Sequence, residues 1–348
     1  MIRVPPFAVV CGLVAAAWTA AATPAWPRQT LSPIPVERLQ PIAALPAHVA
    51  ASMQQITACG QTPQGEYFVF DRRGHTVYTY APGQEAATKL IEIGTEPGRV
   101  LAPTAFRLAR DGSFAVADAP GGVPRVQMFT TSGSSLGGFY LQGAAVPRIL
   151  LGTLVLSGIG AMEYTGRSVL LSQPENGALV VEYSADGRPL RSFGALRATG
   201  QEGDRDVHLA LNSGLVVANP AGGFYFVFLA GVPQFRKYDG EGKLVFERHV
   251  EGREIDSFVQ NLPTTWKRQR TDAGVIPLVL PSSHGAAAVR SGNLWIATAA
   301  GVTYVFDAAG DKRRIVEFAA PGMVTPAGLT FTPKGRLLVT PGCYAFAV

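Results

Sequence analysis

After residue 47 the hydrophobic and polar positions alternate in short runs, and they nowhere sustain a helical period for long. The runs are rich in β-branched and aromatic residues. Glycine-containing turns separate them, for example Asp111-Gly112, Asn176-Gly177 and Asp239-Gly240. Short alternating runs between such turns are typical of antiparallel strands. The pattern therefore predicts an all-β protein.

One type of run recurs along the chain. Its copies are Tyr67–Asp71, Phe114–Asp118, Val169–Gln173, Phe224–Phe228, Leu294–Thr298 and Leu337–Pro341. They begin at positions 67, 114, 169, 224, 294 and 337, and a second run that ends in an aromatic residue follows most of them. A four-stranded propeller blade takes ~40–50 residues. The repeat therefore predicts a six-bladed β-propeller with four-stranded antiparallel blades, and the alternative is a sandwich with a small second domain.

The unit Pro103–Phe139 carries a specific resemblance. It reads PTAFRLARDGSFAVADAPGGVPRVQMFTTSGSSLGGF, with an inner strand, an Asp-Gly turn, a strand ending in Ala-Asp, a loop and a strand ending in Phe. This order resembles the repeat of the NHL-type and TolB-like six-bladed β-propellers, and Gly285–Phe318 is similar. The resemblance implies a closed ring of blades that binds its partner through loops.

The ends of the predicted ring suggest how it closes. The last repeat supplies three strands, Leu329–Phe331, Leu337–Thr340 and Tyr344–Val348. Residues 23–47 form a Pro-rich arm, in which Val36–Ala44 is free to add to a sheet edge. We expect this segment to be the fourth strand of the last blade, because closure removes an exposed edge. The propeller domain then covers residues 48–348.

Residues 1–22 have the layout of a secretory signal peptide: one arginine, a mostly apolar stretch from Phe7, and three alanines. We expect a secreted or periplasmic protein with no stable membrane insertion after cleavage; a retained anchor is the alternative. Cleavage leaves Cys59 and Cys343. We place Cys59 on the innermost strand of the first blade and Cys343 at the start of the third strand of the last, with two strands of sheet between them. Because neighbouring strands lie ~4.8 Å apart, the two Cα atoms should be farther apart than the ~7 Å limit for a disulfide. The prediction is two buried free thiols, and the alternative is that the two cysteines pair in the exported protein.

Composition and charge narrow the function. The chain has 348 residues, 47% of them hydrophobic and 16% charged, which excludes a disordered chain and a coiled coil. The net charge of +5 is spread thinly. A nucleic-acid surface should instead concentrate its basic residues on one element. We expect no nucleic-acid partner and a monomeric protein.

The connection between Glu251 and His284 is far longer than the other blade connections, and long ordered insertions are usually functional. Apolar residues within 253–262 recur at helical spacing, so a short amphipathic helix should lie over the mouth of the ring. An aromatic among cations follows: Trp266, Lys267, Arg268 and Arg270. These residues suit an anionic or sugar-like ligand. The alternative is a solvated basic loop whose tryptophan packs on the rim.

Further candidates lie in loops that should share this face, where binding in closed β scaffolds concentrates. These ligand-binding candidates are Asp118, Asn176, Arg148, His208 and His284. The two histidines lack a short-range metal motif, so no metal site and no cofactor are expected. The leading interpretation is a non-catalytic propeller that binds a protein, peptide or glycan.

The alternative function is a metal-assisted hydrolase or lyase of the lactonase-like kind. Resemblance to those six-bladed propellers would place a divalent ion on a Glu/Asn/Asn/Asp set, here Glu163, Asn176, Asn219 and Asp118. None of the four stands in that family's surrounding motif. Serine-hydrolase, zincin, thioredoxin-like and nucleotide-binding motifs are absent from the sequence.

Overall fold

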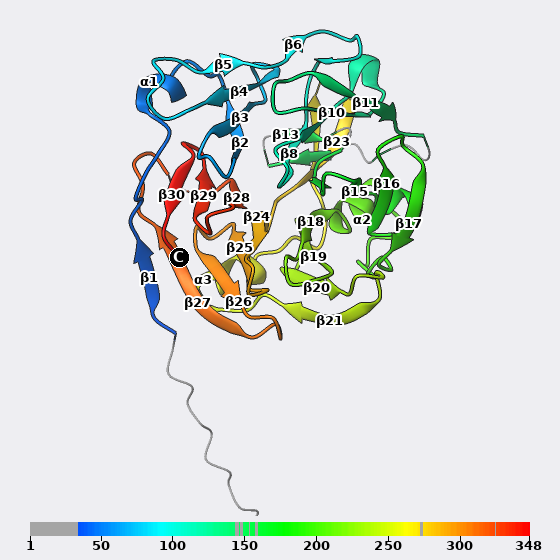
Figure 1. Ribbon diagram of the computed structural model, residues 1–348. Coiled ribbons are helices and arrows are strands. Elements are labelled where there is room, and N and C mark those ends of the chain that lie inside the picture. The colour runs from blue at the N-terminus through cyan, green and yellow to red at the C-terminus, as the bar shows by residue number, and fades with distance from the viewer. Residues whose placement is uncertain are drawn as a thin grey trace, which may run out of the picture. The chain divides into compact units, whose positions relative to one another are not determined.

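The computed structural model describes residues 34–142, 146, 149–152, 154–156, 159–271, 274–323 and 325–348. The predicted signal peptide lies outside these residues. The described chain is a β-propeller, as predicted, and its sheets surround a common centre (Figure 1). No helix of the described residues is long and apolar enough to span a membrane.

Antiparallel meanders form the blades, which we number in chain order. The first blade is β2 (Ile56–Gln61), β3 (Tyr67–Asp71), β4 (Thr76–Tyr80) and β5 (Thr88–Lys89); the second is β8 (Ala105–Leu108), β9 (Phe114–Asp118), β10 (Arg125–Phe129) and β11 (Ser135–Tyr140). The third is β14 (Met162–Tyr164), β15 (Ser168–Ser172), β16 (Val180–Ser184) and β17 (Pro189–Phe193); the fourth is β18 (Gly214–Ala218), β19 (Phe224–Phe228), β20 (Gln234–Tyr238) and β21 (Leu244–His249). The fifth is β24 (Ser283–Ala288), β25 (Leu294–Thr298), β26 (Thr303–Phe306) and β27 (Lys312–Phe318); the sixth is β28 (Gly328–Phe331), β29 (Leu337–Thr340) and β30 (Tyr344–Phe346).

The first strands of the blades contact one another in a closed cycle, from β2 through β8, β14, β18, β24 and β28 back to β2. Each recurring sequence run forms the second strand of one blade. Strands β3, β9 and β25 are buried along their whole length because they are covered on both faces, whereas most of β21 is exposed. The recurring hydrophobic run is thus the part of each blade that lies between its neighbours.

A hydrophobic cluster fills each space between adjacent blades. Between the first two blades the cluster is aromatic: the rings of Phe70 and Phe106 stack at 5.6 Å, and Phe68 and Phe114 approach to 5.6 Å. Fully burying one such side chain contributes roughly 1.5–3 kcal/mol. The blades are therefore held by contacts between sheets as well as by the strand pairing within each sheet.

The N-terminal arm closes the ring in two steps and not as one strand of the last blade. Strand β1 (Val36–Leu39) pairs in parallel with β27 of the fifth blade. Pro41 then interrupts the pairing, since it has no N–H to donate. Ile42 and Ala43 then bond to the sixth blade, where the Ile42 N–H donates to the Ala345 carbonyl and the Ala345 N–H donates to the Ala43 carbonyl, both at 2.8 Å. Helix α1 (Ala47–Ala50) follows.

The prediction of two free thiols is wrong. Cys59 lies on β2, Cys343 lies just before β30, and the two form a disulfide with a Cα–Cα distance of 5.8 Å. Both strand positions were predicted correctly. The predicted distance counted strands as if along one sheet, but the first and sixth blades pack face to face, so the side chains meet across the space between sheets.

The insertion after the fourth blade contains the predicted helix, α3 (Arg253–Gln260). Ile255 packs into the cluster between the fourth and fifth blades, and Glu254 accepts a 2.7 Å hydrogen bond from the Tyr304 hydroxyl. The helix therefore packs between two blades. Two short strands, β6 (Glu92–Ile93) and β7 (Arg99–Val100), and two 3-10 turns, η1 (Pro120–Gly122) and η2 (Pro174–Asn176), complete the connections between and within blades.

Candidate functional site

A cavity of about 570 Å³ lies at the centre of the ring. The first strands of all the blades contribute to its wall, because these strands surround the ring axis. Most of the wall is apolar, including Leu108, Met162, Leu215, Val217 and Leu329. The cavity lies toward the face of the ring at which the first strands begin, which we call the lid face.

A small mixed sheet covers the lid face. It consists of β12 (Ile149–Leu151), β13 (Leu154–Leu156), β22 (Arg268–Thr271) and β23 (Gly274–Val279). Strands β12 and β13 precede the third blade, and β22 and β23 precede the fifth; β12 pairs in parallel with β23 through Leu150–Leu278 and Leu151–Val279. We call these strands, with helix α2 (Arg205–Leu211), the lid.

The lid has a hydrophobic core of its own. Val207 and Leu211 of α2 pack with Ile149 of β12 and Val279 of β23, and Trp266 packs against this cluster. Asp204 caps α2 by accepting from the Val207 N–H and also accepts a 2.6 Å hydrogen bond from Arg268. Leu151, Gly152 and Pro281 form part of the cavity wall (Figure 1 labels β13 and β23 near the ring centre). The lid therefore contributes part of the cavity wall.

An ion pair links the second and third blades, and its arginine lines the cavity. Arg107 Nη2 on β8 is 2.8 Å from Glu163 Oε2 on β14, and the Glu163 side chain is only 7% exposed. Burial raises the pKa of Glu163, and the Arg107 guanidinium opposes that shift. Arg107 therefore has a carboxyl partner in direct contact among the described residues.

Arg72 is a second cation in the wall, and it follows β3 directly. Its Nε and Nη2 donate to the side-chain oxygen of Gln55 at 3.3 and 3.1 Å. In the described part of the chain it has no carboxylate partner. The neighbouring Asp71 carboxylate accepts instead from the backbone N–H groups of Gln54, Gln55 and Gly74.

His284 of β24 also lies in the cavity wall, as expected for a residue at the mouth of the ring. Burial lowers its pKa, so the imidazole is neutral at pH 7. Its ring has no hydrogen-bond partner among residues with described positions. His208, by contrast, lies in α2, and its Nδ1 is 2.7 Å from Thr199 Oγ1. The two histidines therefore do not form one site.

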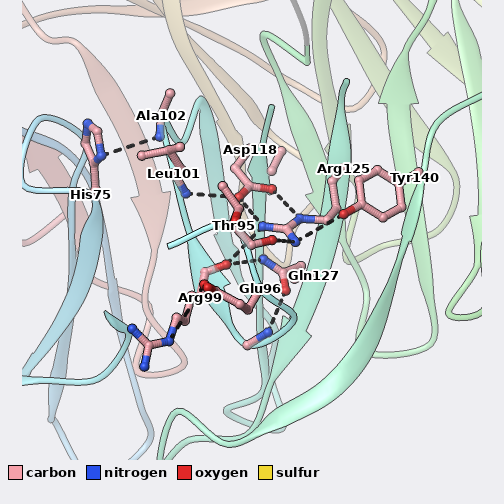
Figure 2. Close-up of polar contacts among 12 residues, drawn as sticks. His75, Thr95, Glu96, Arg99, Leu101, Ala102, Asp118, Arg125, Gln127 and Tyr140 are labelled. Carbon is pink, nitrogen blue, oxygen red and sulfur yellow. Dashed lines mark hydrogen bonds and ion pairs between the residues drawn. The ribbon is translucent and has the colours of Figure 1, made fainter. Parts of the chain in front are cut away.

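The Asp118 carboxylate links β9 to β10 and to the connection that precedes the second blade. Its carboxylate accepts from Arg125 Nε at 2.9 Å and from Arg125 Nη2 at 2.6 Å, and the Leu101 N–H donates to it at 3.1 Å. Figure 2 shows this network, in which the guanidinium also donates to the backbone oxygens of Thr95 and Arg99. Both charged side chains are at most 3% exposed. The carboxylate thus has no face left for a ligand.

The other predicted site residues are dispersed. Trp266 packs in the lid, Arg268 pairs with Asp204, and Lys267 and Arg270 are exposed. Asn176 is exposed at the end of η2, and Arg148 lies outside the described residues. Apart from His284, none of the described candidates lies in the cavity wall.

The carboxylate and amide set of the lactonase-like alternative is not assembled either. Asp118 pairs with Arg125 and Glu163 with Arg107, while Asn219 lies in the turn after β18, at the opposite face from Asn176. Within the described residues, no group of three His, Cys, Asp or Glu side chains is placed to hold a metal ion.

Sequence reasoning missed Arg72 and Arg107. Arg107 had a usable signal: it is a charged residue within the otherwise apolar first strand Ala105–Leu108, and Glu163 stands likewise in the next first strand. Arg72 had none, because it stands in a turn beside another arginine, Arg73, which is exposed.

No protein-family model and no curated protein sequence matches the chain. Solved structures are similar in fold. Selenomethionine-substituted virginiamycin B lyase from Staphylococcus aureus has 10% identity and a TM-score of 0.47, over 81% of this chain and 76% of that one. A streptogramin B lyase has 9% identity and a TM-score of 0.46, over 84% and 92%. A catalytically inactive virginiamycin B lyase from Staphylococcus aureus with quinupristin has 11% identity and a TM-score of 0.49, over 86% and 80%.

Proposed function

We propose that the protein is an exported, non-catalytic binding propeller that holds a small, largely apolar ligand in the central cavity beneath the lid. The observation that carries this proposal is the cavity itself. Its volume of about 570 Å³ falls within the ~300–1,000 Å³ of small-molecule sites, and its wall is apolar with a few polar groups, as in such sites.

The chemistry near the cavity favours binding over catalysis. Glu163 is paired with Arg107, and the described residues that line the cavity include no aspartate or glutamate that could act as a general base. Asp118, the other buried acid on which an enzymatic interpretation would rely, is engaged by Arg125. Removal of metal with a chelator should therefore leave ligand binding unchanged.

The proposed binding face is still the lid face. The proposed ligand is a small molecule, whereas the sequence alone suggested a protein, peptide or glycan. Trp266 would have been the aromatic anchor for a protein, peptide or glycan, and it packs instead against the lid core. Export is supported by the Cys59–Cys343 disulfide, because disulfides persist in oxidising compartments.

The test uses a neutral fluorophore that brightens in apolar surroundings, phenylnaphthylamine. We expect saturable binding to a single site, abolished by Ala327→Trp, which places a large ring in the cavity from an exposed wall position. Ala309→Trp is the matched control, since Ala309 is exposed in the turn between β26 and β27, away from the cavity. Equal binding by both variants would place the dye elsewhere and refute the proposal.

A further inference from the structure

The charges of the cavity wall do not cancel. Among the described residues that line the cavity, Arg72 and Arg107 are charged at neutral pH and no aspartate or glutamate is present. Arg107 is paired at 2.8 Å with Glu163, which does not line the cavity. His284 is neutral at pH 7 because its pKa is lowered by burial. Among the described residues, Arg72 is therefore the arginine of the wall that has no carboxyl partner for its guanidinium.

Arg72 is fixed in place before any ligand arrives. Its backbone N–H donates to the Gln55 carbonyl at 3.0 Å, and Gln55 is itself held by a 2.8 Å hydrogen bond from its N–H to Asp71. The side-chain oxygen of Gln55 accepts from the Nε side of the guanidinium. A cation that is already ordered loses little freedom on binding, which favours affinity.

The N–H donors of this guanidinium that Gln55 does not use have a fixed geometry. An arginine carries five N–H donors, of which Gln55 accepts two. Those that remain include the pair formed by Nη1 and Nη2, which is the fork that receives the two oxygens of a carboxylate side by side. Asp71 does not satisfy this fork, because its oxygens accept from the backbone N–H groups of Gln54, Gln55 and Gly74.

Close packing holds the Asp71 carboxylate against the backbone N–H groups that it accepts from, and not against the Arg72 guanidinium. A Cβ at position 74 would collide with the Asp71 carboxyl group, so a glycine is needed there for the turn to wrap around it. Burial meanwhile lowers the pKa of Arg72, which is the cost of holding a cation with no opposite charge in contact. A bound anion would remove that cost.

We infer that the ligand is an amphipathic monocarboxylate, whose carboxylate binds the free fork of Arg72 and whose apolar part lies along the leucine and valine side chains of the cavity. A single negative charge matches the one wall arginine that lacks a carboxyl partner among the described residues, whereas a phosphate monoester would bring a charge of nearly two. This inference rests on the proposed function, since it assigns the ligand of the same cavity.

The experiment compares octanoate with octanol, which share a chain length and differ in charge. Each displaces phenylnaphthylamine from the full-length protein and from two variants. Arg72→Gln removes the cation but keeps a polar side chain. Arg73→Gln is the matched control, because Arg73 is the adjacent exposed arginine.

We expect Arg72→Gln to weaken octanoate binding about tenfold to a hundredfold, the range of a lost hydrogen bond to a charged group. Octanol and dye should bind as before, and Arg73→Gln should bind all three like the unaltered protein. If octanoate is insensitive to Arg72→Gln while the dye still binds, the monocarboxylate is refuted and the cavity stands. Tighter binding of octyl phosphate than of octanoate would also refute it. If neither dye nor octanoate binds, both the inference and the proposed function fall.

Discussion

Cys59 and Cys343 stand 284 residues apart in the chain, yet they lie 5.8 Å apart between their Cα atoms and form a disulfide that joins the first blade to the sixth. The same space between blades contains Leu45, Met53 and Leu338, and the hydrogen bonds of the arm to Ala345 lie beside it. The junction at which the ring closes therefore has a covalent bond in addition to packing.

Replacing both cysteines by serine should lower the free energy of unfolding by about 3–5 kcal/mol, because the disulfide closes a very long loop in the unfolded chain. Denaturant unfolding of the variant and of the unaltered protein, with and without reductant, measures this. Reductant should shift only the unaltered protein. A midpoint that is the same for both proteins would show that the bond is absent or carries no stability.

Asp118→Asn should destabilise the fold by about 3–5 kcal/mol, because it leaves the Arg125 charge buried without its partner. Dye binding by the folded protein should be unchanged, since Asp118 does not line the cavity. Denaturant unfolding and dye titration at low temperature separate the two effects. Asn176→Ala is the control, with an exposed side chain and little expected change in either measurement. A stable Asp118→Asn variant with lost binding would assign this carboxylate to the site.

His284 should make stability depend on pH. Burial holds its folded-state pKa below the ordinary histidine value of 6.5, so the unfolded chain takes up the proton first as the pH falls. Stability is then lost below pH 6.5, by no more than about 1.4 kcal/mol per pH unit, until the folded-state pKa is passed. Unfolding of His284→Gln at the same pH values provides the reference. A difference between the two proteins that does not change with pH would contradict the assignment.

Trp266→Ala should loosen the lid without unfolding the blades. The side chain packs against the cluster that joins α2 to β12 and β23, and truncating a half-buried tryptophan should cost about 1–3 kcal/mol locally. Hydrogen exchange measures the result: the Gly152 N–H, which donates to the Val279 carbonyl, should exchange faster, while β9 amides keep their protection. Arg268→Ala, which removes only an exposed ion pair, should change exchange little. Unchanged exchange at Gly152 in the tryptophan variant would show that Trp266 does not hold the lid.

The propeller could be predicted from the sequence because its blades are local. Phe114–Asp118 and Arg125–Phe129 are neighbours in the chain and pair with each other as β9 and β10. The alternation of hydrophobic and polar residues in these two runs, and the turn between them, therefore belong to the same blade. Every recurring run proved to be the second strand of a blade for this reason.

The lid and the cavity could not be predicted in this way. The pairing of Leu151 with Val279 joins two connections that are separated in the chain by the third and fourth blades, and nothing in either stretch specifies the other. Trp266 stood out as an aromatic among cations, but its role depends on α2, which folds from a different connection. Arg72 is a candidate because no carboxylate among the described residues contacts its guanidinium. A sequence does not show which acidic side chains are already paired with other groups.

The disulfide also sets an order in time. The sixth blade follows all the others in the chain, so Cys343 leaves the ribosome 284 residues after Cys59. Throughout that interval the Cys59 thiol has no native partner, and the space between the first and sixth blades is unfilled on one side. Covalent closure therefore cannot precede the synthesis of the sixth blade, and a chain that is oxidised at these two positions contains the sequence of every blade.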